Sequence, residues 1–261
     1  MRVATLNIWG VRGAWEERRE VLRTGFEALA PDLVALQETI KTDRYDQVRE
    51  LLPGYHLVHS TERESDGQGI SIASRWPFGE IRELDLDLTP RTKNFACTAL
   101  VAEIEAPEPY GPLLFVNHFP SYEPPLEYER QLQAVRVATF VEDLVARRGG
   151  HAVVAGDLDA DPDSASIRFW TGREPAGDTS VCYRDAWERA HPGEPGTTLT
   201  PDNPLFTQPD WPFRRIDYLL VRCDAAGPTL HVTSCERIFD QPRDGVWASD
   251  HFGVVADLAA R

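Results

Sequence analysis

The sequence predicts an α/β protein in which two β-sheets pack against each other and helices lie outside them. Three observations lead to this prediction: many short strands, few helices, and an interleaved order that begins strand, helix, strand. A hydrophobic content of 42%, including 7 Trp and 11 Phe, can supply a sizeable core. Because 261 residues still fit one domain, we expect a single domain over residues 1–261.

The first strand, helix and strand are expected at residues 3–8, 16–29 and 33–36. The helix is amphipathic because four apolar residues share one face: Val21, Leu22, Phe26 and Leu29. Pro31 and Asp32 break the helix before the second strand begins, and this unit ends at Glu38.

The remaining elements follow from the same periodicities. Further strands are expected at residues 55–58, 70–74, 81–86, 98–104, 113–117, 152–155, 216–221 and 254–258, and helices at 43–51, 126–147 and 164–170. The long helix carries an apolar stripe made of Leu132, Val135, Phe140, Leu144 and Val145. Residues 152–155 are all apolar, which is typical of a strand buried on both faces. Residues 172–213 are rich in Pro, Gly, Thr and Asp, so we expect mostly loops there.

The charge balance limits the choice of partners. The chain has 42 Asp and Glu against 27 Lys and Arg, a formal net charge of -15. Such a charge repels polyanions, so long duplex nucleic acid is disfavoured as a partner, although a generally acidic proteome explains the charge equally well. We expect a monomer.

The first residues enter a strand at once, without the basic and apolar regions of a signal peptide, and no segment is apolar enough to span a membrane. We therefore expect a cytoplasmic protein. The four cysteines lack the spacing of a zinc site, and both free thiols and a disulfide stay open for them.

Polar residues with catalytic or metal-binding chemistry recur where predicted strands meet loops. They are Asn7, Glu38, His118, Asp157, Asp159, Asp217, Asp250 and His251. Loops at one edge of a rigid scaffold are where catalytic groups collect. We therefore expect these side chains to form one site.

A metal site is the first interpretation of this set. Mg²⁺ prefers a few carboxylate or carbonyl oxygens and keeps positions open for water and phosphate. Glu38, Asp250 and the side-chain carbonyl of Asn7 meet that need. Taken alone, Asn7 could instead satisfy backbone groups at a strand end, and Glu38 could begin a turn.

Acid–base chemistry is the second interpretation. Asp217 and His251 could pair, with the carboxylate fixing the tautomer of the ring; the alternative for Asp217 is a salt bridge to Arg214 or Arg215. His118 could donate a hydrogen bond to a phosphoryl oxygen.

Asp157 and Asp159 point the same way at one strand end, so they must bind a cation, share a proton or meet a donor. The rival interpretation is a turn that leads into the helix at 164–170.

The ordered set Leu-Asn, Gln-Glu, Asn-His, Gly-Asp-x-Asp, Ile-Asp-Tyr and Ser-Asp-His, from Asn7 to His251, resembles the endonuclease/exonuclease/phosphatase superfamily, also called DNase I-like. This resemblance implies a four-layered α/β sandwich. It also implies one or two Mg²⁺ or Mn²⁺ ions and hydrolysis of phosphodiesters or phosphomonoesters by in-line attack of water.

The resemblance also implies a role for each residue. Glu38 is similar to the principal metal ligand, supported by Asn7 and Asp250, and Asp217 is similar to the partner of His251. His118 is similar to the histidine that contacts phosphate, and Asp157 to the acid that positions the water or the leaving group. Either Asp157 or His251 is the base. Asp159 departs from the usual Asn, so it is protonated, a second metal ligand, or the mark of a different substrate group.

The substrate must be inferred from loops. Arg91, Lys93 and Asn94 precede one strand, and Trp211, Phe213, Arg214 and Arg215 precede another. We expect Arg91, Asn94 and Arg215 to contact substrate, while solvated arginines are the alternative. The net charge favours a small or lipid-like phosphoester, and the alternatives are a metal-dependent nuclease and a non-catalytic binding module.

Overall fold

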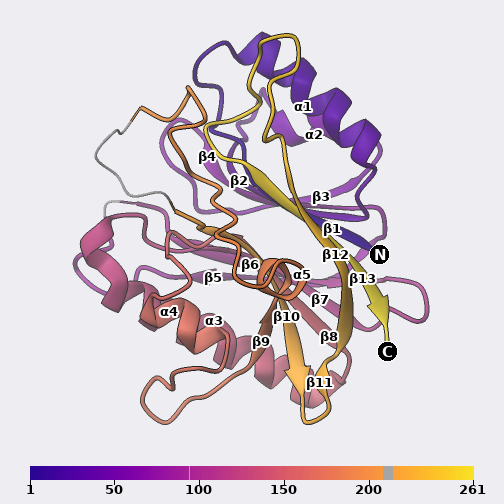
Figure 1. The fold of residues 1–261 in the computed structure, drawn as a ribbon, viewed down its shortest axis with the longest axis vertical. Coiled ribbons are helices and arrows are strands. Elements are labelled where there is room, and N and C mark those ends of the chain that lie inside the picture. Colours follow the sequence, from indigo (N-terminus) through magenta and orange to yellow (C-terminus); the bar gives the residue numbers. More distant parts are fainter. Residues whose placement is uncertain (94, 208–213) are drawn as a thin grey trace.

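The computed structural model describes residues 1–93, 95–207 and 214–261, and it contains two β-sheets with helices outside them (Figure 1). The first sheet has the order β12 (Leu230–Ile238), β13 (Gly253–Ala260), β1 (Arg2–Asn7), β2 (Leu33–Ile40), β4 (Gln68–Ser74), β3 (His56–His59). The second has the order β11 (Gly227–Pro228), β10 (Asp217–Asp224), β8 (His151–Asp157), β7 (Leu113–Phe119), β6 (Thr98–Ile104), β5 (Phe78–Asp85), and β9 (Tyr183–Asp185) also pairs with β10. The helices are α1 (Trp15–Leu29), α2 (Gln47–Leu51), α3 (Glu127–Arg148), α4 (Ala165–Trp170) and α5 (Ala186–Ala190), with a 3-10 turn at Pro124–Leu126.

Three apolar clusters hold four layers together. Alternate residues of β8 divide between two of them: Val153 and Ala155 face the first sheet, while Ala152 and Val154 face α3 and α4. The third cluster joins α1 and α2 to the outer face of the first sheet. Burial on both faces of a strand explains its all-apolar sequence. The predicted four-layered sandwich of two mixed sheets and outer helices is confirmed.

Two strand–helix–strand units stand at corresponding places in the two sheets. β1 and β2 are parallel and joined by α1, and β7 and β8 are parallel and joined by α3. The hairpin β12-β13 flanks the first unit as β5-β6 flanks the second. Both units therefore deliver the carboxyl ends of two parallel strands to the same region between the sheets.

A buried polar network ties the sheets together just below these ends. The Asn117 side-chain amide of β7 donates to the main-chain oxygens of Leu36 (3.0 Å) and Ser71 (2.9 Å) in the opposite sheet. Gln37 Nε2 donates to Asn117 Oδ1 at 2.7 Å. Since buried polar groups are costly unless paired, this satisfied network fixes how the two sheets meet.

Several predicted elements differ in detail. The strand expected at 33–36 continues to Ile40 through an irregularity after Leu36. β9, α5, β11 and β12 were not predicted, and two of them interrupt the expected loop at 172–213. On α3 the buried face is shifted by tertiary packing to Ala134, Val137, Ala138, Val141, Leu144 and Val145.

The state of the cysteines and the length of the helices can also be compared with the predictions. All four cysteines are free thiols. Among the described residues, no helix combines the length and the apolar character that crossing a membrane requires.

Candidate active site

A cavity of about 570 Å³ opens at the strand ends. Six of the residues expected at the site line it: Asn7, Glu38, Asp157, Asp159, Asp250 and His251. Asp217 lies directly behind His251 and contacts its ring. The structure therefore brings seven of the predicted residues together, from both sheets.

Glu38 lies at an interruption of the pairing between β2 and β4. Its φ is +56°, in the left-handed region, and regular pairing of β2 with β4 resumes at Thr39. A bulge of this kind re-aims a side chain while the strand continues on both sides. The Glu38 carboxylate is thereby directed into the cavity from a rigid strand.

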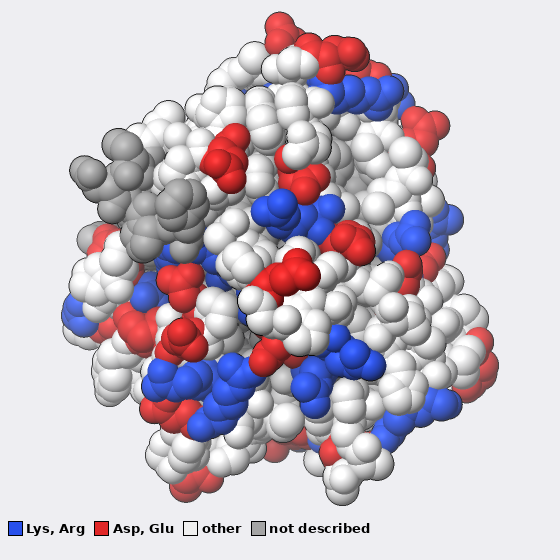
Figure 2. Space-filling model, viewed as in Figure 1, with Lys and Arg blue, Asp and Glu red and all other residues white. Residues whose placement is uncertain are grey.

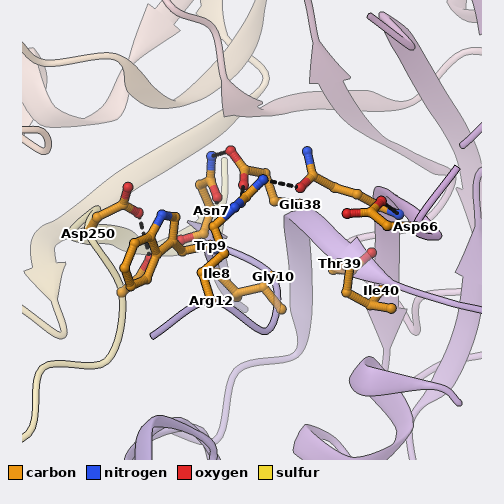
Figure 3. A network of polar contacts seen from close by, with 12 residues as sticks. Asn7, Ile8, Trp9, Gly10, Arg12, Glu38, Thr39, Ile40, Asp66 and Asp250 are labelled. Carbon is orange, nitrogen blue, oxygen red and sulfur yellow. Dashed lines mark hydrogen bonds and ion pairs between the residues drawn. The ribbon is translucent and has the colours of Figure 1, made fainter. Parts of the chain in front are cut away.

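Asn7 links the two sheets at the floor of the cavity. Its Nδ2 donates to Glu38 Oε1 at 3.0 Å (Figure 3). The same Nδ2 donates to Asp157 Oδ2 at 3.0 Å, and Asn7 Oδ1 accepts from the main-chain N–H of Trp9 at 3.0 Å. In this orientation Asn7 holds two carboxylates by its donor groups. Its carbonyl oxygen, which the sequence analysis assigned to a metal, is already engaged by the backbone.

Asp250 reaches the same floor through Ser249. Ser249 Oγ lies 2.7 Å from the main-chain oxygen of Asn7 and 3.3 Å from Asp250 Oδ1. Asn203 Nδ2 also donates to the main-chain oxygen of Ser249 at 2.8 Å. Burial, assisted by the nearby charge of Glu38, raises the pKa of Asp250 to about 6.

His251 and Asp217 form the expected pair. His251 Nδ1 lies 3.0 Å from Asp217 Oδ2, and Nε2 lies 3.9 Å from Asp157 Oδ2. Burial alone lowers the pKa of His251, but the carboxylates of Asp217 and Asp157 outweigh it and raise the pKa well above its ordinary value. The salt bridge of Asp217 to an arginine, kept as an alternative, is not formed.

Asp157 ends β8, next to a glycine that the packing requires. A Cβ on Gly156, whose φ is +152°, would lie 2.0 Å from the main-chain oxygen of His118 on β7. Burial, followed by the charges of Asp159 and Asp217, raises the pKa of Asp157 well above that of an ordinary carboxyl group. Asp157 is thus a carboxylate poised to take up a proton.

Asp159 follows in a left-handed conformation with φ +50°. Arg214 Nη1 lies 3.8 Å from Asp159 Oδ1, and the Arg214 guanidinium also donates to the main-chain oxygen of Asp159. Burial raises the pKa of Asp159 to about 6, against the opposing charge of Arg214. Where an Asn was expected, the chain thus has a buried carboxyl group beside a guanidinium.

His118 is the one histidine of the predicted set that does not line the cavity. It is buried, its ring packs edge-on against Trp170 with centroids 6.0 Å apart, and burial lowers its pKa to about 3. It alternates along β7 with Asn117, which faces the other sheet. The strand period therefore turns His118 toward the outer helices.

Two of the three residues expected to contact substrate, Arg91 and Arg215, have other partners. Arg91 pairs with Glu129 at 3.0 Å and donates to the main-chain oxygen of Pro125, and Arg215 is buried and donates to Asp185 Oδ2 at 2.6 Å. Neither lines the cavity. Asn94, Trp211 and Phe213 lie outside the described residues.

Arg12 and one wall of the cavity were not predicted from the sequence. Arg12 donates to Glu38 Oε2 and to Gln68 Oε1, the latter at 2.8 Å (Figure 3). An aromatic and apolar wall faces them, made of Phe95, Phe119, Tyr122, Leu205 and Phe206. These residues come from separate loops and strand ends, so no periodic signal joins them in the sequence.

The donor set fits a divalent cation. Glu38 and Asp157 share one amide donor, and Asp250 lines the same cavity, so three carboxyl groups are brought together there, with Arg12 as the one Lys or Arg among the described lining residues. Asp157, Asp217 and His251 also offer ligand atoms within 4.8 Å of one another. However, Asp217 is fully buried behind His251, whereas Glu38 faces the cavity, where water and substrate have access. The Glu38 side therefore fits a catalytic ion better.

Comparison with known proteins identifies the family of this chain. Residues 4–251 match the model of the Endonuclease/Exonuclease/phosphatase family. No curated protein matches the chain.

Solved structures with the same fold cover almost the entire chain. A humanized D. rerio TDP2 has 19% identity and a TM-score of 0.75 over 100% of this chain and 99% of its own. A Bacteroides thetaiotaomicron mannosyl-6-phosphatase has 18% identity and a TM-score of 0.75 over 99% of both chains. An endonuclease/exonuclease/phosphatase from Bacteroides vulgatus has 20% identity and a TM-score of 0.73 over 100% and 98%. At such identities the likeness establishes the fold.

Proposed function

This chain belongs to the endonuclease/exonuclease/phosphatase family of phosphoester hydrolases, and from that premise we propose that it is a metal-dependent hydrolase of a small or lipid-like phosphoester. The observation that carries the substrate class is the charge and lining of the cavity. Six carboxyl groups line it, from Glu38, Glu64, Asp66, Asp157, Asp159 and Asp250. Arg12 is the one Lys or Arg among the described residues of its lining.

Such a lining suits one phosphoryl group better than a polyanion. A nucleic-acid strand needs several basic contacts to its phosphates, and binding then depends strongly on salt. The aromatic and apolar wall provides contact area for an uncharged alcohol portion of the substrate. On the face shown in Figure 2, acidic and basic side chains of the described residues are interspersed rather than gathered into a basic stripe.

We assign the metal to Glu38 and Asp250, with Asp157 across the Asn7 bridge. A divalent cation bound at this place would supply Lewis-acid polarisation of the phosphoryl group. The Asn7 amide donates to both Glu38 and Asp157 and so keeps these two carboxylates at a fixed separation.

Asp157 is our candidate for the general base. Its raised pKa brings proton uptake closer to neutrality, as a base for water requires. Against the effect of burial, the carboxylate of Asp217 raises the pKa of His251, which favours the protonated ring, so we assign Nε2 as a hydrogen-bond donor rather than as a proton acceptor. Nε2 lies 3.9 Å from Asp157, the candidate base, so we assign its donor to a phosphoryl oxygen rather than to the leaving group.

The test compares wild type with Glu38→Gln on a nitrophenyl phosphodiester and on a single-stranded oligonucleotide, with Mg²⁺ or Mn²⁺. We expect turnover of the small ester, its loss on chelation, and a fall of at least about a hundredfold in Glu38→Gln, because charge stabilisation at the phosphoryl group is lost. Glu105→Gln, an exposed acid outside the cavity, is the matched control and should retain activity.

Three results would contradict the proposal. Turnover that survives chelation or the Glu38→Gln change would exclude the metal mechanism. Preferential, salt-sensitive cleavage of the oligonucleotide would instead identify a nuclease. Absence of turnover by wild type on phosphomonoesters and phosphodiesters alike would indicate a binding module.

A further inference from the structure

Arg12 and Glu38 form an ion pair at the place where the proposed function puts the metal. Arg12 donates to Glu38 Oε2, and Asn7 donates to Glu38 Oε1, so both oxygens of the carboxylate face donors. Figure 3 shows the Arg12 side chain pointing toward Glu38 from the loop after β1. A divalent cation on this carboxylate would meet the guanidinium at close range and repel it.

Hydrogen bonds hold the backbone of the loop that carries Arg12, whereas the Arg12 side chain is half exposed. Buried Arg18 donates to the main-chain oxygens of Ile8 and Gly10, and Gln47 Nε2 donates to Gly10 at 2.9 Å. In contrast, the Arg12 side chain is 48% exposed, and its second partner is the uncharged Gln68. Arg12 can therefore leave Glu38 by side-chain rotation while its Cα stays at the rim of the cavity.

The cavity offers an incoming phosphoryl group no other Lys or Arg among its described lining residues. A guanidinium is the side chain best matched to phosphate oxygens, because it can donate two parallel hydrogen bonds. A guanidinium displaced from Glu38 thus lies within reach of the anion that the same site must bind.

We propose that Arg12 is an exchangeable cation of this site: it neutralises Glu38 before metal binds, and metal binding transfers it to the phosphoryl group of the substrate. Arg12 thereby lowers the affinity of the site for the metal and raises its affinity for phosphate. The inference rests on the proposed function because it places the metal at Glu38.

The test measures Mn²⁺ binding by titration calorimetry and by the electron paramagnetic resonance of free Mn²⁺, without substrate. Arg12→Gln keeps a hydrogen-bond donor near Glu38 but removes the competing charge, so Mn²⁺ should bind several-fold, on the order of fivefold, more tightly than in wild type. The same variant should bind inorganic phosphate, in the presence of saturating Mn²⁺, about tenfold more weakly. Arg12→Lys should retain both wild-type properties in large part.

Exposed Arg44, which lies outside the cavity, provides the matched control, and Arg44→Gln should match wild type in both titrations. Unchanged or weaker Mn²⁺ binding by Arg12→Gln would overturn the exchange, and unchanged phosphate affinity would overturn the transfer. Glu38→Gln separates the two proposals. If it loses Mn²⁺ binding while Arg12→Gln behaves as wild type, only the inference on Arg12 fails. If it binds Mn²⁺ normally, or wild type binds none, both proposals fail.

Discussion

The two strand–helix–strand units, β1-α1-β2 and β7-α3-β8, share one topology but use their asparagines for different purposes. Asn7 ends β1 and its amide holds Glu38 and Asp157 at the floor of the cavity. Asn117 stands two residues before the end of β7 and its amide holds the main chain of the opposite sheet. The Asn7 amide of the first unit therefore lies in the candidate active site, and the Asn117 amide of the second unit joins the two sheets.

The difference shows that position along the strand, rather than residue type, decides the role. Residues two apart on a strand share a face but not a depth, so an amide further from the strand end lies between the sheets. Asn7 in Asn-Ile and Asn117 in Asn-His look equivalent in the sequence, yet only Asn7 of these two lines the cavity.

Substitution of each asparagine by alanine gives the largest expected effects and separates the two roles. Asn117→Ala should lower the free energy of unfolding by about 3 kcal/mol, because buried carbonyl groups in both sheets lose their donor. Asn7→Ala should lower kcat about a hundredfold and the unfolding free energy by only about 1 kcal/mol. Urea denaturation and steady-state kinetics on both variants check the contrast. Equal destabilisation by the two substitutions would remove the distinction.

Asp159→Asn tests the buried carboxyl groups at the end of the second unit. Its expected effect on activity is smaller than that of Asn7→Ala. Asp159 raises the pKa of Asp157, after the larger effect of burial, so removing its charge should move the acid limb of the pH–rate profile to lower pH. An unchanged acid limb would show that Asp157 is not the base whose ionisation limits the rate.

The same variant makes a prediction for stability. Because the pKa of Asp159 is raised to about 6 in the folded protein, the proton it binds favours folding at low pH, and this contribution disappears as the pH rises through about 6. In the presence of a chelator, Asp159→Asn should therefore stabilise the protein on the order of 2 kcal/mol at pH 8 and less at pH 5. Exposed Asp163→Asn is the matched control, and equal gains at both pH values would contradict the prediction.

The smallest effect is expected at Arg91, which lies outside both units. It pairs with the buried carboxylate of Glu129, so Arg91→Ala should cost about 1 kcal/mol of stability and leave kcat/KM within about twofold. Thermal unfolding and kinetics test this directly. A tenfold loss in kcat/KM would restore the expectation that Arg91 contacts substrate.

The sequence predicted the layers and most central strands because burial on both faces leaves a continuous apolar pattern. Residues 152–155 are the clearest case, and β6 agrees with its predicted bounds. β12 was missed because it lies at the edge of a sheet, where burial is irregular. β9 and α5 are too short to show a period.

The site was predictable where a motif sits directly at a strand end, as for Asp157 and His251. Arg12 was not, because its role comes from a loop whose shape depends on the buried guanidinium of Arg18. For Arg215 the motif suggested a contact with substrate, but proximity in the sequence to Asp217 does not reveal that its side chain turns to Asp185.

The amide of Asn117 also limits how the protein can move. Sliding one sheet past the other would break its hydrogen bonds to Leu36, Ser71 and Gln37 together. Shear between the layers is therefore a costly route to admit substrate, and side chains and loops at the rim must adjust instead. Amide hydrogens along β2, β4 and β7 should accordingly exchange with solvent through global unfolding, as the slowest class in the molecule.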